Sequence, residues 1–335
     1  MKICIKCGMP DTRPGSKFKN NVCLACRNYQ TRKDINWGKR QQILKEICKK
    51  RISEKRKYDC ICPVSGGKDS TFIVSKLCGL GMCPLLVTVM DEFTKTKAGT
   101  HNIKNIAEQF NLDHIYFRCE PKTFKEKTLK DFKDELHPLK WIEEKIYLIP
   151  IRIAKAYGIP LVFFGENSSF EYGTTDKLEL LHPLSDKETK VYYFFAFYPY
   201  NEFETMKEAK KLGYKDLDDC NEWFRQGNVE NFTQIDSIAY IIQLWTKFPK
   251  FGFQRVSDIT SRMLRKKQIT KKQADLLVKE KDYICDPAAK RDFCNVLGIT
   301  EDYFDKIVDK HANKNILTKD VNGNWRRKDL FIRKD

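Results

Sequence analysis

The sequence has no long hydrophobic run, and this absence excludes membrane-spanning classes of protein. Its longest apolar stretches, Pro84 to Met90 and Ile159 to Phe164, are far shorter than the about 20 residues that a helix needs to cross a bilayer. The first residues, Met1 to Cys4, lack the apolar segment of a secretory signal peptide. The chain also has no internal repeat and no low-complexity segment. We therefore expect a soluble, cytoplasmic protein with no membrane partner.

Acidic residues are fewer than basic ones, and the excess of basic residues is distributed unevenly along the chain. The chain carries 62 Lys and Arg against 45 Asp and Glu, a formal net charge of +17. Residues 1–60 alone hold 17 basic and 5 acidic side chains, a net +12. Such a segment attracts polyanions, so tRNA is one candidate partner. A solvated basic face has the same composition, and ATP and nucleotide sugars are anions too. Charge alone therefore leaves these alternatives open.

Between residues 58 and 200, short apolar runs alternate with amphipathic segments. The predicted strands are Tyr58–Val64, Pro84–Met90, His114–Arg118 and Pro160–Phe164. The predicted helices are Asp69–Leu80, Gly99–Phe110 and Trp141–Tyr157. This alternation is typical of an α/β fold with a doubly wound parallel sheet. With 335 residues, 41% of them hydrophobic, the chain is long enough for one large domain or two moderate ones.

The flanking segments differ in pattern from this α/β part. A basic stretch follows the N-terminal residues, with Asp34 as its predicted helix cap. After residue 200, helices dominate; Thr270 with Gln273 forms a capping box, and Thr300 caps a later helix. We predict four parts, which are a Cys-rich module (1–33), a basic helical linker (34–57), an α/β nucleotide domain (58–200) and a helical C-terminal region (201–335).

Four of the thirteen cysteines have the spacing of a metal site. Cys4-x2-Cys7 is followed after fifteen residues by Cys23-x2-Cys26, the spacing of a structural Cys4 zinc site. Four thiolates close the tetrahedron, so zinc here would fold the module without taking part in chemistry. An odd cysteine count with a metal pattern favours a reducing compartment. The sequence therefore predicts a zinc knuckle over residues 1–33.

A glycine-containing loop follows the first predicted strand and opens the first predicted helix. It reads Val64-Ser65-Gly66-Gly67-Lys68-Asp69-Ser70. Its glycines let backbone N–H groups approach a phosphate, while the serine hydroxyls and the helix dipole add to the attraction. Lys68 supplies a positive charge, and Asp69 is the predicted magnesium ligand. The Walker A pattern is absent, so γ-phosphate transfer is not expected.

The segment Ser65 to Ser70 resembles the PP-loop of the ATP pyrophosphatases, which cleave ATP between the α and β phosphates. The resemblance implies that the loop holds the departing pyrophosphate and that AMP is transferred to a substrate oxygen. Two branches of this superfamily combine the loop with a zinc knuckle. The tRNA thiolases carry further paired cysteines after the loop, whereas this chain has only the unpaired Cys78, Cys83 and Cys119 before residue 200. Of these, Cys119 is the one candidate sulfur carrier.

The second branch is the N-acetyl sugar amidotransferases of bacterial surface-glycan synthesis, and the chain is similar to it along almost its whole length. The stretches that carry the resemblance are residues 7–15, 22–29, 165–173, 227–236 and 250–253. The family pattern has a cysteine pair near residues 137–141, where this chain has none. This departure removes the basis for a second metal or redox site but does not affect the ATP chemistry.

The resemblance implies conversion of a sugar acetamido group into an acetamidino group. Adenylation turns the amide oxygen into a leaving group, and ammonia then expels AMP. The sequence contains no recognisable glutaminase triad, so the resemblance implies a partner glutaminase similar to that of histidine biosynthesis, with a cyclase-like barrel protein as a further candidate. The substrate is an N-acetyl sugar or nucleotide sugar, and the cofactors are ATP, magnesium and structural zinc. Nucleic acid is the less favoured partner.

Several residues outside the loop are candidate site residues. Gly165, Glu166 and Asn167 follow a predicted strand and should open onto the same crevice as the loop. We predict that Glu166 binds magnesium or orients ammonia and that Asn167 binds the amide or the sugar, although a helix-capping turn would look the same. Thr88 and Asp91 are candidate contacts to adenosine. Weaker candidates for substrate binding, for which surface or packing roles fit equally well, are Glu171, Tyr172, Lys250 and Arg255.

Overall fold

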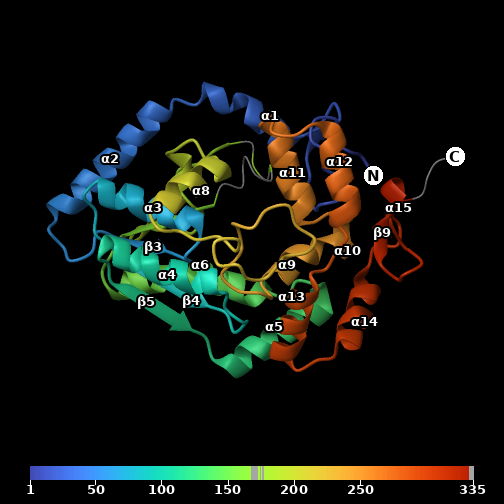
Figure 1. Cartoon of the computed structure of the whole chain (residues 1–335). Coiled ribbons are helices and arrows are strands. Elements are labelled where there is room, and N and C mark those ends of the chain that lie inside the picture. The colour runs from blue at the N-terminus through green and yellow to red at the C-terminus, as the bar shows by residue number, and fades with distance from the viewer. Residues whose placement is uncertain (167–172, 174, 176, 332–335) are drawn as a thin grey trace.

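A five-stranded parallel sheet forms the centre of the computed structural model, which describes residues 1–166, 173, 175 and 177–331 (Figure 1). Its strands are β3 (Cys60–Pro63), β4 (Pro84–Met90), β5 (His114–Arg118), β6 (Leu161–Phe164) and β7 (Lys190–Tyr193). Their order is β5-β4-β3-β6-β7, and every neighbouring pair is parallel. The predicted α/β class and all four predicted strands are confirmed, whereas β7 was not predicted.

Successive strand residues point to opposite faces of the sheet, and both faces are buried because helices cover them. Cys60 and Cys62 pack with residues of three helices on one face, and Ile61 packs with residues of one helix on the other. The first face is covered by α2 (Trp37–Ser53), α3 (Lys68–Gly79) and α4 (Lys97–Phe110), together with the 3-10 turn η2 (Phe194–Ala196). The second face is covered by α6 (Lys140–Ala156), which follows α5 (Pro121–Glu135). The three helices predicted for this part are thus confirmed to within two residues at each end, and α5 was not predicted.

The C-terminal part is mainly helical, as predicted. Its elements are α8 (Glu202–Lys211), α9 (Ile241–Trp245), α10 (Lys247–Phe251), α11 (Arg255–Arg265), α12 (Lys271–Lys281), α13 (Pro287–Leu297), α14 (Glu301–His311), the hairpin strands β8 (Leu317–Lys319) and β9 (Trp325–Arg327), and α15 (Lys328–Phe331). Irregular chain connects α8 to α9. The hairpin was not predicted, because each strand has only three residues and too little alternation to detect.

An aromatic core joins the C-terminal helices to α5. The ring of Phe132 lies 5.1 Å from that of Phe293 and 4.9 Å from that of Phe304, measured between centroids. Phe124 and Trp245 belong to the same buried cluster. This core therefore contains residues from both sides of residue 200, so the division into domains at that point stays a prediction.

The Cys-rich module packs against the C-terminal helices rather than extending from the chain. It comprises β1 (Phe18–Lys19), β2 (Val22–Cys23), α1 (Leu24–Thr31) and the 3-10 turn η1 (Arg32–Asp34). The Thr12 hydroxyl donates to the Phe251 carbonyl at 2.5 Å, and Arg13 forms an ion pair with Asp258 of α11 at 3.5 Å. Figure 1 shows the blue N-terminal segment beside the orange helices α11 and α12.

Helix caps follow from local sequence, with one correction. Thr270 and Gln273 form the predicted capping box of α12, and the Thr300 hydroxyl caps α14. The predicted cap at Asp34 is wrong, because that residue ends η1 and the side chain of Asn36 accepts the Lys39 N–H at the start of α2. Among the described residues, no helix combines the length and the apolar character that a membrane crossing requires.

Candidate active site at the phosphate loop

The predicted phosphate loop joins β3 to α3 at a switch point of the sheet. β4 lies on one side of β3 and β6 on the other, and open α/β sheets bind ligands beside such a point, at the carboxyl ends of their strands. Gly66 has a φ of 81°, and a Cβ there would lie 2.8 Å from the backbone nitrogen of Ile103 on α4. Gly67 is the N-cap of α3, so the first N–H groups of that helix have no helical carbonyl to bind. These N–H groups and the helix dipole favour an anion here.

The serine side chains hold the loop in shape. The Ser65 N–H donates to the Ser70 hydroxyl at 3.2 Å, and the Gly67 N–H donates to the Ser65 hydroxyl at 3.4 Å. Both hydroxyls therefore bridge parts of the loop. Their contact with a phosphate stays a prediction.

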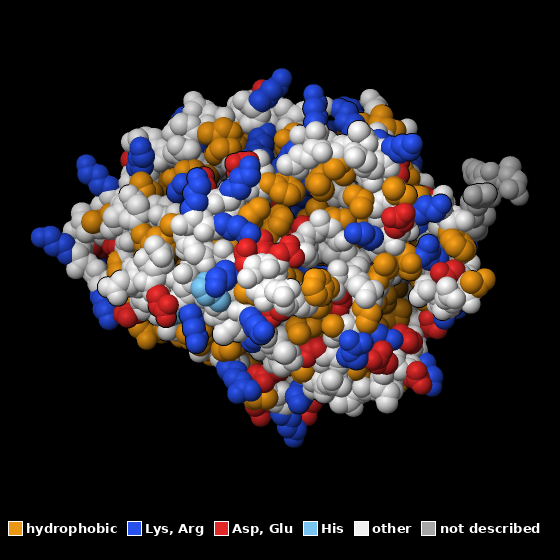
Figure 2. Space-filling model, viewed as in Figure 1, with side chains coloured by type: hydrophobic (Ala, Val, Ile, Leu, Met, Phe, Trp, Pro, Cys, Tyr) orange, Lys and Arg blue, Asp and Glu red, His pale blue; other side chains and the backbone are white. Residues whose placement is uncertain are grey.

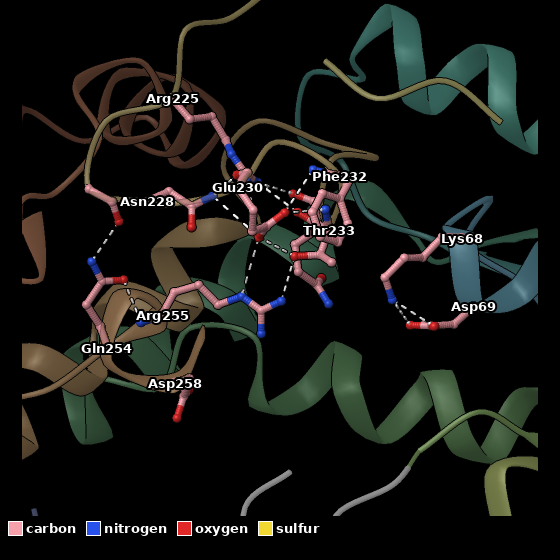
Figure 3. A network of polar contacts seen from close by, with 12 residues as sticks. Lys68, Asp69, Arg225, Asn228, Glu230, Phe232, Thr233, Gln254, Arg255 and Asp258 are labelled. Atoms are coloured by element: carbon pink, nitrogen blue, oxygen red, sulfur yellow. Dashed lines mark hydrogen bonds and ion pairs between the residues drawn. The ribbon is translucent and has the colours of Figure 1, made fainter. Parts of the chain in front are cut away.

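Lys68 and Asp69 form an ion pair inside the site (Figure 3). The ammonium of Lys68 lies 2.7 Å from each carboxylate oxygen of Asp69 and donates to the Tyr200 hydroxyl at 3.1 Å. The Lys68 side chain is 2% exposed, whereas that of Asp69 is 38% exposed. Lys68 thus orients the carboxylate of Asp69, an arrangement that the sequence did not predict. Their roles toward phosphate and magnesium stay predictions.

A cavity that is open to solvent lies in front of the loop. Residues 65–70 line one side; the rest of the lining comes from Gly99 and Asn102 of α4, Tyr214, and residues 232–236 of the irregular chain before α9. Asn102 exchanges two hydrogen bonds of 2.7 Å with the backbone of Lys215. The Tyr214 hydroxyl donates to the Phe232 carbonyl at 2.6 Å. The C-terminal part of the chain therefore forms a wall of the cavity at the phosphate loop.

Contacts with the start of α4 fix the backbone of this wall. The Thr96 N–H donates to the Asp236 carbonyl at 3.3 Å, and the Ile238 N–H donates to the Thr94 carbonyl at 2.9 Å. The Thr96 hydroxyl also donates to the Ile235 carbonyl. Only glycine fits at position 99, because a Cβ there would lie 2.5 Å from the Cα of Asp236. Residues 235–238 are therefore held against α4 by backbone contacts.

The carboxyl of Asp236 has an altered proton affinity. Burial raises its pKa to about 6; the charge of Lys95 opposes this shift and that of Asp91 adds to it. Asp91 itself accepts hydrogen bonds from the Phe93 N–H at 2.9 Å and the Ser237 hydroxyl at 3.0 Å, and it pairs with Lys95 at 2.9 Å. Asp91 thus supports the wall beside Asp236. Its predicted contact with adenosine stays a prediction.

A buried charge network supports the wall from behind (Figure 3). The guanidinium of Arg225 donates to the carbonyls of Glu230, Thr233 and Gln234 at 2.7 to 3.0 Å. The carboxylate of Glu230 accepts the Phe232 and Thr233 N–H groups at 2.8 and 2.9 Å and lies 3.4 Å from Arg225. The side chains of Glu230 and Arg225 are 3% and 2% exposed.

Arg255, a predicted substrate residue, belongs to this network. Its guanidinium donates to the Thr233 hydroxyl at 2.5 Å, and its Nε lies 3.8 Å from the Glu230 carboxylate. Burial raises the pKa of Glu230, but Arg225, Arg255 and the hydrogen bonds from Thr233 and Phe232 outweigh burial, and the pKa is lowered. Arg255 therefore supports the cavity wall, and its contact with substrate stays a prediction.

Three other predicted residues are not among the described residues that line the cavity. Thr88 is buried, and its hydroxyl donates to the Val64 carbonyl at 2.6 Å. Gly165 packs behind α3, where a Cβ would lie 2.9 Å from the Ile73 side chain. Glu166 lies near Tyr147 of α6, whose pKa is raised by burial and then by the charge of Glu166.

Of the remaining substrate candidates, three lie outside the described part of the chain and one, Lys250, lies within it. Asn167, Glu171 and Tyr172 lie outside the described residues. The Lys250 ammonium donates to the Glu135 carbonyl at 3.3 Å, and burial lowers its pKa to about 8. No role was predicted for Asp236 or Glu230, although both lie in the resembling stretch 227–236. Irregular chain has no periodicity that would reveal which side chains face a cavity.

The four knuckle cysteines form a compact buried cluster. Their sulfur atoms all lie within 4.8 Å of one another. The distance between the sulfurs of Cys4 and Cys26 is 3.9 Å, and that between Cys7 and Cys23 is 3.6 Å. A tetrahedral Zn²⁺ with bonds of about 2.3 Å separates its sulfur ligands by about 3.8 Å. The predicted cysteines are therefore brought together in a set that can hold a metal ion.

Residues 226–329 match the family model of the C-terminal domain of WbpG-like LPS biosynthesis proteins. The match includes Glu230, Arg255 and Asp236, and it ends just after β9. Residues 232–236, which line the cavity opposite the phosphate loop, thus lie within the matched segment. No curated protein matches the sequence.

Solved structures with similarity to the chain include three synthetases. NMN synthetase from Francisella tularensis is 11% identical over 70% of this chain and 94% of its own, with a TM-score of 0.40. NAD+ synthetase from Burkholderia pseudomallei is 12% identical over 77% and 98%, with a TM-score of 0.37. NH3-dependent NAD synthetase from Campylobacter jejuni is 16% identical over 54% and 79%, with a TM-score of 0.34. At these scores, the fold assignment rests on the sheet and loop described above.

Proposed function

We propose that this chain, whose residues 226–329 match the C-terminal domain model of WbpG-like lipopolysaccharide biosynthesis proteins, is an ATP-dependent N-acetyl sugar amidotransferase. It adenylates the acetamido oxygen of an N-acetyl sugar or nucleotide sugar and replaces that oxygen with ammonia. The products are an acetamidino sugar, AMP and pyrophosphate, in the synthesis of a bacterial surface glycan such as O-antigen. The observation that carries this proposal is the cavity shared by the phosphate loop and residues 232–236 of the WbpG-like domain.

In the first step, the amide oxygen attacks the α-phosphorus of ATP and pyrophosphate leaves. The N–H groups at the start of α3 bind the departing phosphates, because they have no helical carbonyl partner and the helix dipole favours negative charge. Fixed donors of this kind stabilise charge as it develops in the transition state. Lys68 holds the Asp69 carboxylate toward the cavity.

Asp69 is the residue that would hold magnesium. Its carboxylate is partly exposed beside the N–H groups of the loop, and carboxylate oxygen is a preferred ligand of this ion. When bound, magnesium neutralises phosphate charge. The four-cysteine cluster would hold zinc, which would fix the knuckle against α11 and α12 without taking part in the reaction.

In the second step, ammonia attacks the activated carbon and AMP leaves. Ammonia is scarce at neutral pH, so we propose a separate glutaminase subunit that resembles the one in histidine biosynthesis. A cyclase-like barrel protein between the two subunits is a further part of this proposal. The reaction as a whole uses intracellular ATP and is proposed to take place in the cytoplasm.

The alternative of a tRNA thiolase has less support. Such an enzyme needs an exposed, activated thiol. Nine of the thirteen cysteines lie outside the knuckle cluster, and burial raises the pKa of every one of them, Cys119 included. On the face drawn in Figure 2, Lys and Arg side chains are interspersed with Asp and Glu rather than gathered into one stripe. Neither feature favours sulfur transfer to a nucleic acid.

A mass-spectrometric assay tests the proposed function. The protein is incubated with ATP, magnesium, ammonium at high pH and a panel of free and nucleotide-linked N-acetyl sugars. We expect AMP and pyrophosphate to be released together with a product whose acetamido oxygen has been replaced by NH. Lys68→Ala should abolish both, whereas Lys76→Ala on the same helix should not, because Lys76 pairs with Glu208 outside the cavity. Turnover with tRNA and a sulfur donor but with none of the sugars would overturn the proposal.

A further inference from the structure

Among the described residues, one ionisable side chain of the cavity at the phosphate loop has no bonding partner from another residue. Lys68 and Asp69 bind each other, and the Tyr214 hydroxyl donates to the Phe232 carbonyl. Asp236 lines the same cavity; its carboxyl accepts a hydrogen bond from its own backbone N–H, and in the described part of the chain no other residue is bonded to that carboxyl. A carboxylate that accepts one backbone hydrogen bond still has free lone pairs and can accept a proton. Of the two carboxyls among the described residues of the cavity, that of Asp236 is therefore the one that no other residue binds.

The position of Asp236 is fixed by the backbone rather than by its side chain. Its carbonyl accepts the Thr96 N–H at 3.3 Å, and the next residue, Ser237, donates its hydroxyl to Asp91 at 3.0 Å. The Cα of Asp236 packs so closely on Gly99 that no Cβ fits between them. The carboxyl is thus presented from a rigid segment, as proton transfer in a defined geometry requires.

We propose that Asp236 is the general base of the amination step. This assignment rests on the proposed function and adds the residue that handles the proton. When the nitrogen of ammonia bonds to the activated carbon, one N–H proton passes to the Asp236 carboxylate. The bond from that carbon to the AMP oxygen then breaks, and AMP leaves with the electron pair. The carbon keeps the new nitrogen, and the protonated Asp236 returns its proton to water.

The charges around Asp236 are compatible with this task. Lys95, Asp91 and Arg225 are the nearby charged groups whose fields act on its carboxyl, and the hydroxyls of Tyr214 and Tyr240 are also close. With a pKa of about 6, the carboxyl is ionised at neutral pH yet more basic than an ordinary aspartate. Asp69 is less suited, because Lys68 already neutralises its charge.

Two partial reactions separate the base from other roles. Sugar-dependent exchange of pyrophosphate into ATP reports adenylation, and amidine formation reports amination. In Asp236→Asn, exchange should stay within a few-fold of the wild type, while amination should fall about 100-fold or more. Hydroxylamine, a stronger nucleophile at neutral pH, should restore part of the second step. Asp218→Asn is the matched control, since Asp218 is exposed and its carboxylate accepts a hydrogen bond only from Asn231 among the described residues.

The pH profile gives a second readout. At a constant concentration of free ammonia, wild-type amination should rise through about pH 6, and Asp236→Asn should lose this limb. Asp236→Glu keeps a carboxylate and should therefore retain part of the amination activity. This variant distinguishes loss of the base from disruption of the cavity wall. Exchange lost together with amination, or a raised magnesium requirement in Asp236→Asn, would overturn the assignment in favour of a metal ligand. Unchanged amination would also overturn it. A wild-type enzyme that shows no sugar-dependent exchange would instead refute the proposed function itself.

Discussion

Replacing Glu230 with glutamine should destabilise the protein markedly without changing the shape of the side chain. The carboxylate is the counter-charge of Arg225 and Arg255, and the side chains of all three residues are at most 10% exposed. Glutamine can still accept the Phe232 and Thr233 N–H groups through its amide oxygen. The substitution therefore mainly removes one buried negative charge and leaves two buried positive charges.

The size of the effect follows from this burial. Breaking a buried ion pair by removing one partner costs about 3–5 kcal/mol. Arg225 keeps its bonds to three loop carbonyls, so we take the lower end, about 3 kcal/mol. For 335 residues the unfolding entropy is about 0.7 kcal/mol/K, so Tm should fall by about 4 °C if unfolding is cooperative.

Thermal unfolding followed by circular dichroism at neutral pH tests this expectation. Glu204→Gln is the matched control; its carboxylate pairs with Lys207 at the surface and is 61% exposed, so Tm should change little. A second variant, Glu230→Gln combined with Arg255→Met, should recover part of the loss because it restores charge balance. If Glu230→Gln unfolds at the temperature of the wild type, the network does not stabilise the wall and this reasoning is refuted.

Three further predictions concern the knuckle, the loop and acid stability. Metal analysis should find one zinc per chain, and Cys26→Ser should lower both the zinc content and Tm. In Gly66→Ala, the left-handed backbone should cost about 1–2 kcal/mol of unfolding free energy, and the clash with α4 should add to this cost and weaken ATP binding. In Gly67→Ala, the new Cβ would approach only a serine hydroxyl, at 3.3 Å, so the Tm should stay that of the wild type. Burial would raise the pKa of Glu202, but the charges of Arg262 and a neighbouring lysine hold it at about 2. The stabilisation from ionised Glu202 is therefore complete above pH 4.5 and lost as the pH falls toward 2, so Glu202→Gln should flatten this limb of an acid-unfolding curve.

The sequence by itself determined the features that depend on neighbouring residues. The strand Pro84–Met90 and the capping box at Thr270 were predicted at their observed positions, because alternation and capping act within a few residues. The geometry of the phosphate loop and of each cysteine pair is likewise determined by residues that are close together in the sequence. The predicted cap at Asp34 was wrong, because two suitable side chains lie two residues apart and the observed helix begins after the second.

Only the tertiary structure decided what faces the loop. Asp236 and Asp69 are far apart in the sequence, and they line one cavity because backbone bonds and a close contact at Gly99 hold the irregular chain against α4. The pairing of Glu230 with Arg255 and the use of Thr88 within the sheet also arise from contacts between distant segments. Side-chain type fixes which bonds a residue is able to make. Which of them it makes is decided by the packing around it, since burial removes water as the alternative partner.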